Sequence, residues 1–317
     1  MNAIMIKTYF IVCLVLATSS IVGAQSKPIP DTSGIQIDFI SDTQQPLLLE
    51  KIIRHSNHNT KATALLFLEI LKNRPRSLYM LGDIVSLGFE NNKWKKVDVF
   101  LDNCRKENIP VFGLLGNHEL LLCKKKGESN FNKRFPGSVP TGYISVIDSM
   151  AIVLLNSNFK KLSSADRKKE IDWYKSALNT LDTSNAIKSI IVTCHHAPYS
   201  NSLVVGSSKP VQENFVHPFI NSKKAVLFIT GHSHNFEHFK IMGKDFLVIG
   251  GGGGLHQPLD NSEKRLPDVS ADYKPLFHYL SMRRVADQLQ VTSHYLKNDF
   301  TGFDTGYTFS VLLPVVD

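Results

Sequence analysis

Five apolar segments of the chain are each followed directly by a side chain that can bind a metal ion. The segments have the length and composition of β-strands, and helical spacing of apolar residues separates several of them. Alternating strands and helices are typical of an open sheet, which binds ligands where the carboxyl ends of its strands meet. The residues at these ends are Asp42, Asp83, Asn117, His195 or His196, and His232 with His234.

Hydrophobic periodicity predicts where the other elements lie. Helices are expected at 63–72, 94–105 and 211–221, and another follows the capping sequence that begins at Ser163. The segments at 142–147 and 151–155 are close enough to pair as antiparallel strands. Further strands are predicted at 35–40, 78–81, 111–115, 189–194, 225–230, 246–249, 279–285, 289–295 and 307–312.

Mixed Asp, Asn and His ligands favour first-row transition metals over Ca²⁺. Six or seven such side chains are too many for one tetrahedral ion. They suit two ions that share a carboxylate, an arrangement that stabilises in-line displacement at phosphorus. The pattern therefore predicts a centre of two metal ions.

In order and spacing, these residues resemble the motifs of the calcineurin-like metallophosphoesterases, from about residue 35 to residue 255. The two most specific motifs are Gly116-Asn117-His118-Glu119 and Gly231-His232-Ser233-His234. The other matching pieces are Asp42, Gly82-Asp83 and His195-His196.

The resemblance implies an α/β fold, a four-layered α/β/β/α sandwich of two mixed sheets flanked by helices. It implies a single domain over 25–317, in which the strands after about residue 276 complete the second sheet. A run of glycines at 250–254 is expected to form a loop that passes close to the site, because no helix start follows it.

The resemblance also implies a role for each site residue. Asp83 would bridge two divalent or trivalent ions, of Mn, Zn or Fe, and His118 would act on the phosphate or the leaving group. His195, which comes straight off its strand, is preferred as a ligand over His196, which would then support the ligands or replace His195. The remaining ligands would be Asp42, Gln44 and His234 for the first ion, and Asn117 and His232 for the second.

Two positions depart from the family pattern. The first motif is usually Asp-x-His, but here Gln44 stands in place of the histidine, and an amide oxygen is a weaker ligand than imidazole. His55 and His58 follow and could substitute, or could lie in a surface loop. Purple acid phosphatases have a tyrosine where this chain has Ser86, so their tyrosinate–iron pair is not expected.

The function implied is metal-dependent hydrolysis of a small phosphate ester by a hydroxide that bridges the two ions. The alternative is a weakened member of the family that binds phosphate or another ligand, with Gln44 as the first lost ligand. A nuclease is disfavoured because no basic stripe interleaved with aromatic residues is present, so no nucleic-acid motif is identified. The sequence names neither the substrate nor the oligomeric state.

Residues 1–24 are typical of a signal peptide. Lys7 precedes a short apolar run at 9–17, and small residues lead to a cleavage site after Ala24. The mature protein is therefore expected to be exported, periplasmic or secreted, without a stable membrane anchor. The alternative is an uncleaved anchor.

The formal net charge of +8 favours anionic substrates. A lysine cluster at 124–126 follows the Asn117-His118 loop and could either meet substrate or form a solvated face. In an oxidising compartment, Cys104 and Cys123 could form a disulfide, whereas Cys194 is expected to be buried and free.

Overall fold

Two six-stranded β-sheets form the centre of the computed structural model, which describes residues 34–47, 50 and 58–314. All of these belong to one of the two units into which the chain divides, Ser33–Asp317. The predicted signal peptide at 1–24 lies outside the described residues.

The first sheet has the order β12-β11-β10-β1-β2-β3. Its amino-terminal half is the predicted parallel arrangement, in which β1 pairs with β2 and β2 pairs with β3. The strands are β1 (Gln36–Ile40), β2 (Ser77–Met80), β3 (Val111–Gly113), β10 (His278–Val285), β11 (Gln288–Leu296) and β12 (Phe303–Leu312).

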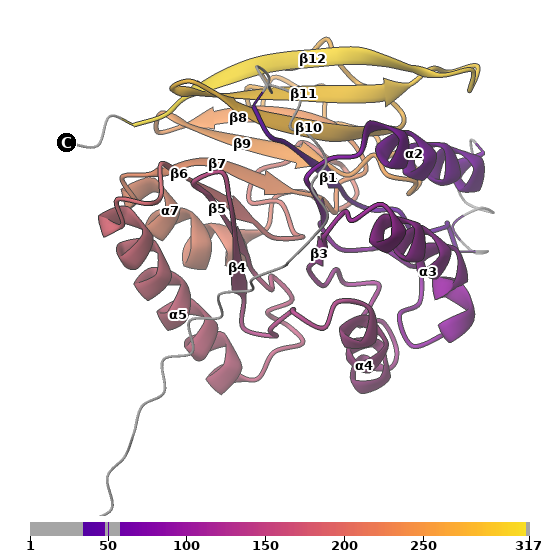
Figure 1. Cartoon of the computed structure of the whole chain (residues 1–317), viewed down its shortest axis with the longest axis horizontal. Coiled ribbons are helices and arrows are strands. Elements are labelled where there is room, and N and C mark those ends of the chain that lie inside the picture. Colours follow the sequence, from indigo (N-terminus) through magenta and orange to yellow (C-terminus); the bar gives the residue numbers. More distant parts are fainter. Residues whose placement is uncertain (1–33, 48–49, 51–57, 315–317) are drawn as a thin grey trace, which may run out of the picture. The chain divides into compact units, whose positions relative to one another are not determined.

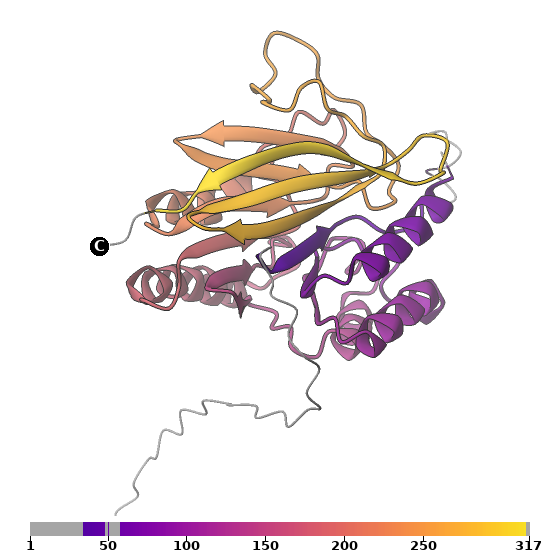
Figure 2. The same ribbon diagram turned by 45° about the horizontal axis from the view of Figure 1, so that its top comes forward.

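The carboxyl-terminal strands correct one expectation, because they join the first sheet and not the second. β10 pairs antiparallel with β1, with Phe39 opposite Leu280, and Figure 2 shows β10, β11 and β12 side by side. Without β10, the second edge of β1 would have unpaired backbone groups. Met282 and Val291 of the added strands are buried between the two sheets, which explains why they pack here.

The second sheet has the order β4-β5-β6-β7-β9-β8. The predicted antiparallel pairing of β4 with β5 is confirmed. Periodicity missed β8, because Glu237 and His238 are buried polar residues that interrupt its apolar pattern. The strands are β4 (Tyr143–Ile147), β5 (Met150–Leu154), β6 (Ser189–Thr193), β7 (Ala225–Thr230), β8 (Phe236–Ile241) and β9 (Lys244–Ile249).

Helices lie on the outer face of each sheet (Figure 1). α2 (Asn59–Asn73) and α3 (Asn91–Lys106) pack on the first sheet. α5 (Ser164–Thr183) packs on the second, and its predicted cap is present, since Ser163 Oγ accepts from the Asp166 N–H at 3.0 Å. The helical segment expected at 211–221 consists of α6 (Lys209–Val211), the π-helix η1 (Gln212–Val216) and α7 (His217–Asn221). Periodicity missed α4 (Lys124–Arg134), which has few apolar residues.

Side chains alternate between the two faces of each sheet, as strand geometry requires. Tyr79 of β2 faces the core between the sheets, whereas its neighbours Leu78 and Met80 face the helices. In the second sheet, Leu227 faces the inter-sheet core and Phe228 faces the outer helices. The central strands of both sheets are therefore buried on both faces, between the other sheet and the outer helices, which confirms the four-layered α/β/β/α arrangement.

The three described cysteines are free, which corrects the possible disulfide. Cys104 is buried in α3 and Cys123 is exposed, so the two thiols lie in different environments. Cys194 is free and buried, as predicted. In the described part of the chain, we found no helix both apolar and long enough to cross a membrane.

Candidate metal centre

The loops that follow five strands of the two sheets supply the predicted site residues. Asp42, Asp83 and Asn117 follow β1, β2 and β3 of the first sheet, and His195 and His232 follow β6 and β7 of the second. Beside them lies a cavity of about 290 Å³. Its walls are Glu50, Asp83, Asn117, His118, Val204, Val205, His232, His234, Leu255 and Gln257.

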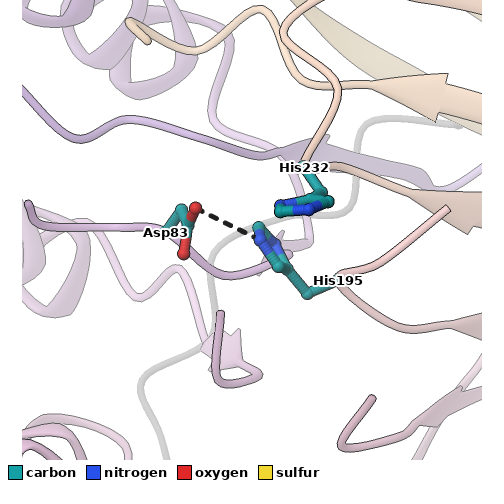
Figure 3. Close-up of side chains that lie close together, drawn as sticks. All are labelled: Asp83, His195 and His232. Carbon is teal, nitrogen blue, oxygen red and sulfur yellow. Dashed lines mark ion pairs between the residues drawn. The ribbon is translucent and has the colours of Figure 1, made fainter. Parts of the chain in front are cut away.

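Four residues form the tighter part of the site, which we call the Asp83 cluster: Asp83, Asn117, His195 and His232. Ligand atoms of Asp83, His195 and His232 all lie within 4.8 Å of one another (Figure 3). His195 Nε2 is 3.2 Å from Asp83 Oδ2 and 3.2 Å from Asn117 Oδ1. Among the described residues, this is the one group of three His, Cys, Asp or Glu side chains with metal-site spacing.

The hydrogen bonds of His195 leave one ring nitrogen available to a metal. Nδ1 donates to the Leu81 carbonyl at 2.9 Å, so Nε2 is the ring nitrogen that faces Asp83 and that a metal could take in place of a proton. Burial opposes the charged ring, but Asp83, Asp42 and the Leu81 carbonyl together outweigh it and raise the pKa of His195 to about 9. Burial, together with the neighbouring His196 and His195, holds the pKa of His232 well below its usual value.

Three residues form a second part of the site, the Asp42 group: Asp42, Gln44 and His234. His234 Nδ1 donates to the Leu255 carbonyl at 2.7 Å, and its Nε2 lies 3.4 Å from Asp42 Oδ1. Asp42 Oδ2 accepts from the His232 N–H at 2.9 Å, but buried Oδ1 accepts no hydrogen bond. A buried carboxylate oxygen without a hydrogen bond is one that a cation would satisfy.

The backbone orients the Gln44 amide. The surrounding acceptors assign the amide nitrogen to the side that faces the Asp83 and Asp42 carbonyls, at 2.7 and 3.0 Å, because the opposite assignment would point the amide oxygen at two carbonyl oxygens. Its oxygen is therefore directed toward the other members of the Asp42 group, 3.2 Å from His234 Nε2. In the family that this chain resembles, this position is usually a histidine. Gln44 thus presents an amide oxygen in place of an imidazole nitrogen.

Asp42, Asp83 and His232 have left-handed backbone conformations, with φ of 60°, 48° and 67°. Such conformations cost on the order of 1–3 kcal/mol each and gather at functional sites. Hydrogen bonds hold two of these turns: the Asp42 N–H donates to the Gly82 carbonyl, and the Gln44 N–H to the Asp83 carbonyl. The strain is therefore offset by contacts that fix the ligands.

The glycine loop at 250–254 passes close to the site, as predicted. A Cβ on Gly254 would lie 2.4 Å from the His234 ring, and one on Gly250 would lie 2.0 Å from the Ser233 carbonyl oxygen. The backbone of this loop can therefore pack against the His-x-His turn only where side chains are absent.

Glu119 has a structural role that the sequence reasoning missed. Its buried carboxylate accepts from four backbone N–H groups, those of Asp83, Ile84, Val85 and Gly116, at 2.8–3.1 Å. It thereby joins the loop after β2 to the loop after β3 and holds Asp83 beside Asn117. In the sequence, Glu119 is a single acidic residue followed by three leucines, and this pattern gives little indication of its structural role.

His118 lies at the cavity wall without joining the cluster. Nδ1 donates to the Ser86 carbonyl at 3.0 Å, and Nε2 is 3.9 Å from Asp83 Oδ2. Burial opposes a positive ring, but Asp83 and the Ser86 carbonyl raise the pKa of His118 above its usual value. A ring held in this way can donate a proton into the cavity.

His196 is held by a neighbour outside the cluster. Its Nδ1 is 2.8 Å from Ser157 Oγ, which also accepts from the His196 N–H at 2.9 Å. Its ring packs on the His232 ring with centroids 4.4 Å apart. The structure thus places His196 beside His232, while His195 faces Asp83.

Two other candidates, His58 and the lysine cluster at 124–126, lie outside the cavity wall. His58 is exposed and packs edge-on against Phe300. The lysine cluster begins α4, where Lys124 donates to the Lys161 carbonyl. His55 lies outside the described residues.

The residues present fit transition-metal ions. His195 and His234 each use Nδ1 on a carbonyl and so offer Nε2, and Asp42 has a buried oxygen that lacks a hydrogen bond. Imidazole nitrogen with carboxylate and amide oxygen is a donor set of the kind that Mn, Zn and Fe accept. Asp83 contacts both groups: its carboxylate lies beside His195, and its backbone carbonyl accepts the Gln44 N–H at 3.0 Å.

Comparisons with known proteins give the family and the fold of the chain. A family model described as calcineurin-like phosphoesterase matches residues 35–236, which is more than half of the chain. No match was found among the curated proteins.

Solved structures share the fold at low sequence identity. A purple acid phosphatase, PPD1 from yellow lupin (Lupinus luteus) seeds, has a TM-score of 0.67 over 88% of this chain at 13% identity, and this chain spans 54% of it. GAP50 of Plasmodium, described as the anchor in the inner membrane complex, has a TM-score of 0.64 at 14% identity, covering 89% of this chain and 90% of its own. A dimetal phosphatase from Danio rerio has a TM-score of 0.56 at 14% identity, covering 86% of this chain and 98% of its own. At these identities the likeness shows the fold alone.

Proposed function

Since the chain belongs to the calcineurin-like phosphoesterase family, we propose that it hydrolyses a small phosphate ester with two transition-metal ions, Mn, Zn or Fe. Asp42, Gln44 and His234 would hold the first ion. Asn117, His195 and His232 would hold the second, and Asp83 would bridge the two. When bound, the ions neutralise charge on the phosphate and activate a water molecule for in-line attack.

The observation that carries this proposal is the position of Asp83. Its Oδ1 accepts the His118 N–H at 2.8 Å, and its Oδ2 lies 3.2 Å from His195 Nε2. His195 and His118 hold the pKa of Asp83 below its usual value, although burial alone would raise it. An ionised carboxylate beside these side chains, on a backbone that also contacts Gln44, is what a shared metal ligand requires.

His118 is the residue that would act on the reacting atoms. Its ring lines the cavity and is oriented by the Ser86 carbonyl. In the transition state it would donate a proton or a charged hydrogen bond to the leaving oxygen. A positioned acid of this kind contributes about 10²–10⁴-fold to turnover.

A binding protein is the second candidate, and Gln44 is the observation that favours it. The weaker amide ligand could leave the first metal position too labile for catalysis. GAP50, which shares the fold, is described as an anchor and not by an activity, so the fold does not require catalysis. Against this candidate, the other ligands and His118 are all present.

A substrate panel separates the two candidates. Metal-stripped full-length protein would be assayed with phosphomonoesters and phosphodiesters after addition of Mn, Zn, Fe, Ni or Mg. We expect turnover that depends on the added metal. Binding of phosphate compounds without turnover, with any of the metals, would support the binding protein and contradict hydrolysis.

Export is part of the proposal and rests on residues 1–24 alone. A basic residue, a short apolar run and small residues before Ala24 are typical of a cleaved signal peptide. Amino-terminal sequencing of the mature protein should begin at Gln25. A chain that retains Met1 or the apolar run in a membrane fraction would contradict cleavage.

A further inference from the structure

The described part of the cavity wall beside the metal centre has an unusual charge for a phosphate site. The chain as a whole has a net charge of +8, yet no Lys or Arg is among the described residues that line the cavity. Phosphate sites ordinarily use these side chains to balance a dianion. Here Glu50 adds a carboxylate to the wall instead.

A hydrogen bond fixes Glu50 in the cavity wall. Its Oε2 accepts from the Leu47 N–H at 2.6 Å. The metal ions would supply the positive charge that attracts phosphate, and the Glu50 carboxylate would oppose it. The opposition is about twice as large for a dianion as for a monoanion, because Coulomb energy scales with charge.

Another part of the cavity wall is apolar. It consists of Val204, Val205 and Leu255, and the Val204 side chain is 43% exposed. Exposed apolar side chains at the mouth of a binding site offer a surface for an apolar part of a ligand.

Hydrogen bonds hold this wall in place. Ser202 Oγ donates to Gln257 Oε1 at 2.6 Å and accepts from the N–H groups of Val204 and Val205 at 3.1 and 3.3 Å. Ser202 also forms a β-bridge with Leu259. The apolar residues are therefore presented by an ordered loop.

The start of the loop is anchored in the second sheet. The buried carboxylate of Glu237, in β8, accepts from Ser200 Oγ and from the Asn201 N–H, both at 2.7 Å. The apolar wall and the His-x-His turn that precedes β8 are thus held by one rigid element.

From the charge and the wall together, we infer that the site takes a phosphodiester with an apolar ester group in preference to a phosphomonoester. The inference rests on the proposed hydrolysis at this site. A diester carries one negative charge, whereas a monoester carries about two above its second pKa of about 6. The metal ions would hold the phosphate, and the second ester group would lie on Val204, Val205 and Leu255.

Three probes with the same leaving group test the charge preference. Metal-loaded full-length protein would be assayed with p-nitrophenyl phosphate and with methyl and butyl p-nitrophenyl phosphodiesters, at about pH 8, where the monoester is dianionic. We expect kcat/KM to be higher for the diesters. We also expect it to rise from methyl to butyl, by at most about fourfold for each methylene that is buried.

Variants assign the preference to the cavity wall. Glu50→Gln and Val204→Lys should each raise kcat/KM for the monoester by roughly 3- to 10-fold, with the diester changed less than about twofold. Glu107→Gln is the matched control, because it removes a surface carboxylate that pairs with Arg74 outside the cavity. Val205→Ser should reduce the gain from methyl to butyl.

The outcomes separate this inference from the proposed hydrolysis. A wild type that prefers the monoester, with a ratio unchanged in Glu50→Gln, would overturn the inference and leave hydrolysis standing. If no probe is turned over with any metal, hydrolysis fails, and calorimetric binding of diethyl phosphate and inorganic phosphate then decides the inference. Tighter binding of diethyl phosphate supports it, and equal or tighter binding of inorganic phosphate overturns it.

Discussion

The two halves of the proposed metal centre, the Asp83 cluster and the Asp42 group, differ in the kind of ligands they offer and in how closely these ligands are brought together. The Asp83 cluster brings two imidazoles, a carboxylate and an amide together, with three ligand atoms within 4.8 Å of one another. The Asp42 group has one imidazole, and its Gln44 offers an amide oxygen where imidazole is usual in the family. Its Asp42 Oδ1 is buried without a hydrogen bond.

From this difference we infer that the two ions of the proposed centre would bind with unequal affinity. Ligands already held in place lose little freedom when a metal binds, and imidazole binds transition metals better than an amide does. We therefore expect the Asp83 cluster to fill first. The Asp42 group would fill at higher metal concentration, with Asp83 as the link between them.

Replacing Asp83, the ligand that the two groups would share, should reduce metal binding and activity more than any other substitution. Asp83→Asn should lose both ions and lower kcat/KM by more than about 10³-fold, because the site loses several kcal/mol of charge stabilisation. Elemental analysis and a hydrolysis assay on the same sample measure both quantities. Two retained ions with near-normal activity would show that Asp83 is not shared.

His118→Asn should separate chemistry from metal binding. Turnover should fall by about 10²–10⁴-fold, because the proton donor is lost, while both ions remain. The loss should be greater for alkyl esters, whose leaving groups need protonation, than for activated aryl esters. Loss of metal from this variant would make His118 a ligand and contradict its assigned role.

Glu119→Gln should loosen the Asp83 cluster more than the Asp42 group. The carboxylate accepts four backbone N–H groups, and an amide in its place would present its own N–H groups to some of them. Loss of such support typically costs about 10–100-fold in metal affinity. Metal titration of the variant checks this, with circular dichroism as a control for folding. Unchanged affinity of the tight site would contradict the role of Glu119.

The metal affinity of the Asp83 cluster should rise with pH. Without metal, Asp83, Asp42 and the Leu81 carbonyl raise the pKa of His195 from an ordinary 6.5 to about 9, so this ring is protonated at neutral pH. A metal ion must displace that proton, and proton competition weakens as pH approaches 9. Calorimetry in buffers of different ionisation enthalpy should detect proton release on binding near pH 7. Affinity that is independent of pH between about 6.5 and 9 would contradict it.

The strand ends could be predicted because continuous apolar runs stop at single polar residues such as Asp83 and His195. The pairing of β10 with β1 could not be predicted, since the pairing of strands far apart in sequence depends on how the whole chain folds. The role of Glu119 was hidden for a related reason: three of its four donors lie in the loop after β2. The apolar wall at Val204 also escaped, because only folding brings its loop beside Leu255.

The most direct test of the unequal centre is a metal titration of stripped wild type and Gln44→His, followed by calorimetry and by hydrolysis. In the wild type we expect two binding steps, with activity appearing in the second and weaker one. In Gln44→His the weaker step should tighten by roughly tenfold, because imidazole replaces an amide oxygen, while the tight step stays unchanged. A single binding step in the wild type, or a weaker step that does not respond to Gln44→His, would contradict the account.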